Sequence, residues 1–220
     1  QEEIVVTAER RAQTLARTPM SAASLDRAQL VRIAPQAPSE ALNRIAGVNL
    51  QRGSGLESLP AIRSPVLTGG QGAGSILVLE DGVPIRAPGF SNINQAFELG
   101  LDLAERIEVV RGPGSALAGS NAVHGLINVI TPINAQSMSV ALLQAGVEGG
   151  EFGRASARAL LLHDQGEGGR AISLGASLRH DGGYRAAAGF DQQHLYLAAA
   201  GQMGNWLYDA ALTGQNMNQE

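Results

Sequence analysis

Two kinds of hydrophobic pattern divide the chain near Pro132. Before it, apolar residues form short unbroken runs, such as 76–79 and 126–130, separated by glycine and proline. After it, apolar and polar residues alternate, as they do over 172–179. Unbroken runs are typical of strands covered on both faces, whereas alternation is typical of strands with one apolar face. The sequence therefore predicts a mixed α/β region followed by half-covered strands.

Two short helices are predicted in the first region. Asp26, with Gln29 three positions later, forms a capping-box pattern and predicts a helix over 27–33. Ser39 is a favourable N-cap, so a second helix is predicted over 40–46.

Several short strands are predicted around these helices. The run 76–79 is almost wholly apolar and should form a central, covered strand. Asp81 and Gly82 follow it and predict a tight hairpin turn. The predicted strands of the first region cover residues 20–25, 48–52, 61–63, 76–79, 83–85, 106–111 and 126–130.

The second region has the pattern of strands with two different faces. Over 172–179, Leu174 and Leu178 share one face, while Ser173 and Ser177 share the other. Of the eight aromatic residues, the six that follow residue 136 include several near predicted strand ends. Such a distribution is typical of the aromatic girdle of a membrane barrel.

Composition excludes several classes of function. The net charge of −4, without a basic cluster, argues against a nucleic-acid footprint. The absence of cysteine excludes disulfides and thiolate metal sites. His163 and His180 lack the spacing of metal ligands, so no metal or cofactor is predicted. No apolar run reaches 18 residues, which excludes a transmembrane helix, and the chain starts without a leader, as a mature exported protein would.

The glycine-rich stretch 105–131 does not fit an enzyme motif. Ser120 stands where a phosphate-binding loop requires lysine, and Leu117 stands where the dinucleotide fingerprint requires its third glycine. Ser115 lacks the flanking glycines of a nucleophile elbow. With no other catalytic constellation in the sequence, the prediction is that the protein is not an enzyme.

What this stretch does resemble, closely, is the plug domain of TonB-dependent outer-membrane receptors. Its sequence from residue 106 reads Arg-Ile-Glu-Val-Val-Arg-Gly-Pro-Gly-Ser-Ala-Leu-Ala-Gly-Ser-Asn-Ala-Val-His-Gly-Leu-Ile-Asn-Val-Ile-Thr. Two positions depart from the family pattern: Ala118 replaces the usual aromatic residue, and His124 replaces the usual glycine. The residues that carry the plug signature are Arg106, Glu108, Arg111, Gly112, Pro113, Gly119 and Asn128.

The resemblance implies a three-part organisation. Residues 1–18 would be a TonB box and flexible tether, and 19–133 an α+β plug domain with a mixed sheet and short helices. Residues 134–220 would form the first antiparallel strands of a transmembrane β-barrel, with room for about five strands of roughly ten residues. Because open sheet edges are not tolerated in lipid, the chain is expected to be incomplete.

The resemblance also suggests two contact regions. The N-terminal β-prone segment is similar to a TonB box, which adds as a strand to the sheet of the energising protein TonB; the alternative is a frayed strand. Its residues are Glu3, Ile4, Val5, Val6, Thr7 and Ala8. The loops 64–75 and 86–95 either connect strands or, as in the family, contact ligand. The ligand-binding candidates are Thr68, Gln71, Arg86, Phe90, Asn92 and Asn94.

The function implied by the resemblance is gated uptake of a scarce nutrient across the outer membrane, with the plug facing the periplasm. The expected partners are TonB, a small-molecule ligand such as an iron chelate, and outer-membrane lipid. Ferric siderophores are the family's commonest cargo, although vitamin, haem and sugar importers share these motifs. The alternative is a soluble periplasmic binding or interaction module without transport activity.

Overall fold

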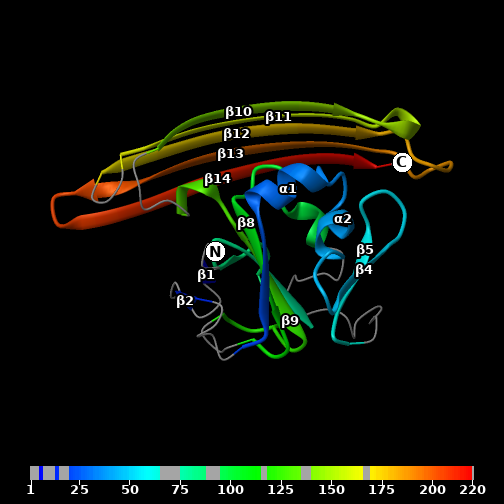
Figure 1. The fold of residues 1–220 in the computed structure, drawn as a ribbon, viewed down its shortest axis with the longest axis horizontal. Coiled ribbons are helices and arrows are strands. Elements are labelled where there is room, and N and C mark those ends of the chain that lie inside the picture. Colours follow the sequence, from blue (N-terminus) through cyan, green and yellow to red (C-terminus); the bar gives the residue numbers. More distant parts are fainter. Residues whose placement is uncertain are drawn as a thin grey trace. The chain divides into compact units, whose positions relative to one another are not determined.

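The protein forms two compact units, Gln1–Ile130 and Thr131–Glu220, which are drawn as ribbons in Figure 1. The sequence predicted a domain boundary after residue 133. The computed structural model describes residues 5–6, 13–14, 20–64, 75–87, 95–114, 118–134, 140–165 and 169–219.

A five-stranded mixed sheet forms the centre of the first unit, in the order β3-β8-β9-β6-β7. β6 pairs with β9 in parallel, and the other neighbours are antiparallel. β6 is nearly wholly buried, as its apolar run predicts, and it lies between β9 and a short edge strand. The strands are β3 (Ala22–Asp26), β6 (Ile76–Glu80), β7 (Val83–Pro84), β8 (Arg106–Arg111) and β9 (Gly125–Ile130).

The predicted hairpin between β6 and β7 is confirmed. Asp81 and Gly82 both have positive φ, 50° and 78°, which is the conformation that a two-residue type I′ turn requires. The side-chain oxygen of Asn128 accepts a hydrogen bond from the backbone N–H of Gly82 at 3.0 Å. The buried Asn128 of β9 therefore fixes a turn 46 positions away in the sequence.

The first predicted helix is also confirmed. α1 (Arg27–Ile33) starts with the complete capping box: Asp26 accepts from the backbone N–H of Gln29 at 2.7 Å, and Gln29 accepts from that of Asp26 at 2.9 Å. The box gives partners to the N–H groups of Asp26 and Gln29, so local sequence sets the start of the helix.

The prediction for the second helix, with an N-cap at Ser39 and a helix over 40–46, is wrong. α2 (Pro38–Leu42) starts earlier, because proline has the fixed φ and the missing N–H that suit the first helical position. It also ends earlier. The Asn43 side chain accepts from the N–H of Leu50 at 2.6 Å and donates to its carbonyl at 3.2 Å, which turns the chain into the next strand.

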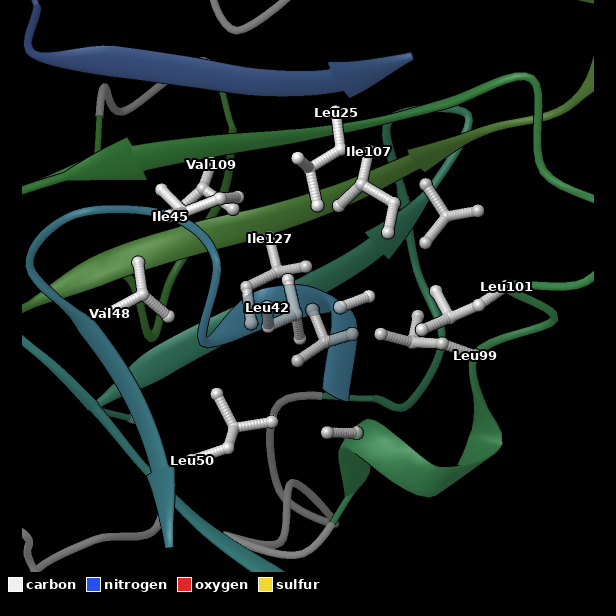
Figure 2. Close-up of a cluster of buried hydrophobic side chains, with 14 of the residues drawn as sticks. Leu25, Leu42, Ile45, Val48, Leu50, Leu99, Leu101, Ile107, Val109 and Ile127 are labelled. Carbon is white, nitrogen blue, oxygen red and sulfur yellow. The ribbon is translucent and has the colours of Figure 1, made fainter. Parts of the chain in front are cut away.

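Hydrophobic clusters cover both faces of the mixed sheet. Ile107, Val109 and Ile127 point to one face and pack with the α2 segment, as Figure 2 shows. Val110 and Leu126, which have the opposite parity, belong to a second cluster. The main cluster also includes Leu25, Leu42, Ile45, Val48, Leu50, Leu99 and Leu101.

Smaller elements complete the first unit. These elements are β1 (Val5–Val6) paired with β2 (Gln13–Thr14), β4 (Val48–Arg52) paired with β5 (Ser58–Ile62), and η4 (Gln95–Glu98). β4 is as predicted, β5 starts earlier than predicted, and the 3₁₀ turn η4 was not predicted.

Among the described residues, no helix is long and apolar enough to cross a membrane.

The second unit is one antiparallel sheet in the sequential order β10-β11-β12-β13-β14. The five long strands lie side by side in Figure 1. Their number agrees with the prediction of about five strands. They are β10 (Val140–Gly149), β11 (Ala155–Asp164), β12 (Arg170–Asp181), β13 (Phe190–Met203) and β14 (Trp206–Gln219), with 3₁₀ turns η5 (Pro132–Asn134) and η6 (Glu151–Gly153).

A glycine in β9 provides a test of the packing in the first unit. A Cβ at Gly125 would lie 2.6 Å from the Val110 carbonyl oxygen and 2.9 Å from Ile62 Cδ1. We therefore expect Gly125→Ala to destabilise the unit by roughly 1–3 kcal/mol, the usual cost of overpacking. Hydrogen exchange of β8 and β9 in urea measures the loss. Gly214→Ala is the control, because its Cβ meets nothing within 4 Å; equal exchange in both variants would contradict the expectation.

Candidate functional site

Arg111, a plug-signature residue, ties together three segments of the first unit. Its guanidinium donates to the Ala46 carbonyl at 2.8 Å and to the Ala22 carbonyl at 3.2 Å. Its backbone N–H donates to the Ser21 carbonyl at 2.8 Å. The side chain therefore joins the end of β8 to the start of β3 and to the turn before β4.

Arg63 reinforces the same junction, although no sequence pattern pointed to it. Its guanidinium donates to the Ser21 hydroxyl at 2.9 Å, from a backbone with a positive φ of 49°. Gly47 lies beside both arginines: an added Cβ there would lie 3.4 Å from Arg63 Cγ and 3.7 Å from Arg111 Cδ. Thus Ser21, which directly precedes β3, is held by both arginines.

A second signature pair lies inside the sheet. Arg106 Nε donates to Glu108 Oε1 at 2.8 Å, and Glu108 is 0% exposed. Asn128 lies directly opposite Glu108 on β9. A buried carboxylate is costly unless it is paired, and Arg106 provides a partner for Glu108. The pair lies within the mixed sheet.

The signature glycines have backbone conformations that other residues rarely adopt. Gly112 and Gly119 have φ of 112° and 111°. Pro113 lies between β8 and β9, and the N–H of Gly112 donates to the His124 carbonyl at 2.8 Å. Glycine and proline here allow the chain to leave β8 and return as β9.

Among the ligand-binding candidates, the structure describes Arg86. Its guanidinium makes a two-point ion pair with Glu98, with Nε 2.9 Å from both carboxylate oxygens. Hydrogen bonding to Glu98 raises the pKa of Arg86 above its usual value. An anionic ligand would therefore compete with Glu98 for this cation. The other candidates, Thr68, Gln71, Phe90, Asn92 and Asn94, lie outside the described residues.

The predicted TonB-contact segment is described only at Val5 and Val6. These residues form β1, which pairs with β2 within the chain: Val5 lies opposite Thr14, and Val6 opposite Gln13. Glu3, Ile4, Thr7 and Ala8 lie outside the described residues. The β-prone character predicted for the segment agrees with the strand formed by its centre.

The second unit has an apolar exposed face. The strand register places one leucine of each strand in a single cross-strand row. All five side chains are 44–75% exposed. In water, a continuous row of this kind would be an unfavourable surface. The row, called the leucine row below, consists of Leu143, Leu161, Leu174, Leu197 and Leu212.

The reverse side of β11–β13 is buried and carries polar side chains beside apolar ones such as Leu160 and Leu162. On β12, Ser173, Ser177 and Arg179 are at most 4% exposed and alternate with exposed Leu174 and Leu178. Ion pairs stabilise this face: Arg154 Nε donates to Asp181 at 3.0 Å, and Arg158 pairs with Glu148. On β12, buried polar side chains and exposed leucines reverse the arrangement of a strand in a water-soluble sheet.

Aromatic residues occur on both faces. Trp206 and Tyr208 lie on the exposed face, at the end of β14 next to the two-residue turn. Tyr196 instead belongs to the buried face, where its hydroxyl donates to Thr131 Oγ1 at 2.8 Å. Trp206 and Tyr208 therefore have the exposed strand-end position that a girdle would require, whereas Tyr196 has a structural role.

Comparison with known proteins identifies the family. Residues 14–126, more than half of the chain, match the family model of the TonB-dependent receptor plug domain. The chain belongs to the TonB-dependent receptor family. The mixed sheet with short helices and the antiparallel strands that follow it are the fold of these receptors.

Relatives of known structure or function are TonB-dependent receptors and transporters. The vitamin B12 transporter BtuB of Vibrio vulnificus is 30% identical over 190 residues, 86% of this chain, and the chain spans 28% of its length. Pseudomonas aeruginosa FpvA bound to a pyoverdine aligns with a TM-score of 0.75 at 14% identity, covering 96% of this chain and 27% of FpvA. The copper transporter OprC aligns with a TM-score of 0.71 at 13% identity, and the alignment covers 90% of this chain and 30% of OprC. The structural likenesses show the fold.

The contacts of the Arg111 guanidinium with the carbonyls of Ala46 and Ala22, called the Arg111 clamp, give a testable prediction for the plug. Lysine cannot span two carbonyl groups as a guanidinium does, so Arg111→Lys should cost roughly 1–3 kcal/mol locally. Hydrogen exchange should rise at Ser21 and over β3, while β10–β14 stay unchanged. The matched control is Arg44→Lys, at an exposed position near the clamp. Unaltered exchange of β3 in Arg111→Lys would show that the clamp does not hold this strand.

Proposed function

We propose that the chain forms the plug and first barrel strands of a receptor for gated nutrient uptake across the bacterial outer membrane. The observation that carries the proposal is the reversed sheet of the second unit, with the leucine row exposed and Ser173, Ser177 and Arg179 buried. An outward apolar face and an inward polar face are what a strand of a transmembrane barrel requires. The parts would be a TonB box and tether (1–18), a plug (19–133) and barrel strands (134–220).

The proposed cargo is a bulky metal chelate, with a ferric siderophore as the first candidate. The fold matches receptors whose structures contain siderophore ligands, such as FpvA bound to a pyoverdine. Cobalamin is the second candidate, because a relative at 30% identity is a vitamin B12 transporter. The candidate ligand contacts are those of the loops 64–75 and 86–95, and of these Arg86 would exchange its Glu98 partner for an anionic group of the cargo.

The alternative, a soluble periplasmic module, fits the second unit poorly. A water-soluble sandwich would bury the leucine row and expose the polar side chains of β12, whereas the opposite is observed. We therefore propose a location in the outer membrane, with residues 3–8 on the periplasmic side, where they would meet TonB.

Energy coupling can be tested at Val6. If residues 3–8 add as a strand to TonB, Val6→Pro removes a backbone donor and should abolish uptake while surface binding of the cargo persists. The measurement is uptake and binding of radiolabelled ferric siderophore, and separately of cobalamin, in cells that carry the complete receptor. Val6→Ala keeps the N–H and serves as the control. Normal uptake by Val6→Pro would exclude this segment as the coupling strand.

Membrane depth can be tested on the exposed face. Arginine at Leu174, in the middle of β12, should cost roughly 2–4 kcal/mol if the row lies near the bilayer midplane. Arginine at Met203, exposed on the same face but beside the two-residue turn, should cost about 0–1 kcal/mol. Urea unfolding of the complete receptor in bilayers gives both values. Equal costs at the two positions would argue against a membrane-spanning sheet.

A further inference from the structure

The ion pair between Arg86 and Glu98 has a geometry that bears on cargo selection. Arg86 lies two positions after β7, and Glu98 is the last residue of η4. Nε of Arg86 lies 2.9 Å from both carboxylate oxygens, and Nη2 pairs with Oε1. The carboxylate therefore occupies one edge of the guanidinium with both of its oxygens.

Both partners of this pair are attached to well-packed parts of the first unit. Ile85, which precedes the arginine, packs against the main cluster, and its backbone N–H donates to a carbonyl of β6 at 3.2 Å. Leu99, which follows Glu98, is buried. At the start of η4, the side-chain amide of Gln95 donates to the Ile76 carbonyl at 3.2 Å. The core thus holds the cation and the carboxylate in place from two sides.

The pair is nevertheless accessible from solvent. The Arg86 side chain is 37% exposed and that of Glu98 is 21% exposed. A partly exposed ion pair contributes only about 0–1 kcal/mol to stability. An incoming group can therefore replace the carboxylate at little cost to the fold.

Replacement of Glu98 sets a condition on the incoming group. A single uncharged oxygen would exchange a charge-assisted, two-point contact for one weaker hydrogen bond. A carboxylate or phosphate offers two oxygens that share a negative charge, so it restores both bonds to the guanidinium fork. Specificity of this kind arises because the competing carboxylate makes binding of the wrong group unfavourable.

We propose that Glu98 determines cargo specificity as a built-in competitor for Arg86. The cargo class it selects is a metal chelate with a free two-oxygen anionic group, such as a carboxylate, on its surface. This inference rests on the proposed function, because only cargo that contacts the loop 86–95 meets the pair. A purely structural ion pair would have the opposite signature, since its loss would leave cargo binding weaker or unchanged.

The test uses two iron(III) chelates as probes: ferric citrate, which carries free carboxylates, and ferrichrome, an uncharged hydroxamate chelate. Isothermal titration measures their binding to the complete receptor in detergent. Glu98→Gln should bind ferric citrate about tenfold more tightly than wild type, as for the loss of one competing charged contact, and should gain nothing toward ferrichrome. Glu57→Gln makes the same change of charge at an exposed position in the β4–β5 turn and should bind as wild type does.

A double variant assigns the gain to the arginine. Adding Arg86→Gln to Glu98→Gln removes the cation for which the carboxylate competes, so the tighter binding of ferric citrate should disappear. Three outcomes would overturn the proposal: no gain or no binding of ferric citrate in Glu98→Gln, an equal gain for ferrichrome, or a gain that survives in the double variant.

The proposed function is tested independently of these titrations. Binding in detergent does not depend on membrane insertion, so a failure here leaves the barrel assignment unaffected. A failure of the proposed function would appear separately, as equal costs of arginine at Leu174 and Met203.

Discussion

The register of β10–β14 is the constraint on which the second unit depends. Side chains alternate between the two faces of a strand, so a slip of one residue would bury the leucines and expose Ser173 and Arg179. Unbroken antiparallel pairing across all five strands keeps the leucine row aligned. In lipid this pairing has a second role, because backbone groups there find no water to replace a missing partner.

In the first unit, the signature of the receptor family supports the architecture. Arg111 holds the ends of three segments together, Arg106 pairs with the buried Glu108, and Asn128 fixes the β6–β7 turn. None of these contacts involves a loop proposed to recognise cargo. The signature thus identifies the fold, and the loops 64–75 and 86–95 are the part that we propose for cargo recognition.

Features set by neighbouring residues were predictable from the sequence. The Asp26–Gln29 capping box, the Asp81–Gly82 turn and the alternation over 172–179 each depend on a few adjacent positions. The contacts of Arg111 were not predictable, because its partners Ala46 and Ala22 lie 65 and 89 positions away.

The same reason explains the errors. The second helix was misplaced because Asn43 bonds to Leu50 of the following strand, a contact that its local pattern does not reveal. The ion pair between Arg86 and Glu98 was not predicted, because Glu98 lies in the 3₁₀ turn η4, which no sequence pattern indicated.

Contact with lipid along β12 is the most direct test of the central claim. Single cysteines can be placed from Ile172 to Leu178 in a complete receptor from which any cysteine outside this chain has been removed, and labelled with bimane. Brominated phospholipids then report which labels touch acyl chains. The account predicts quenching at 172, 174, 176 and 178 and none at 173, 175 and 177. Absence of quenching at every position, or uniform quenching, would contradict it.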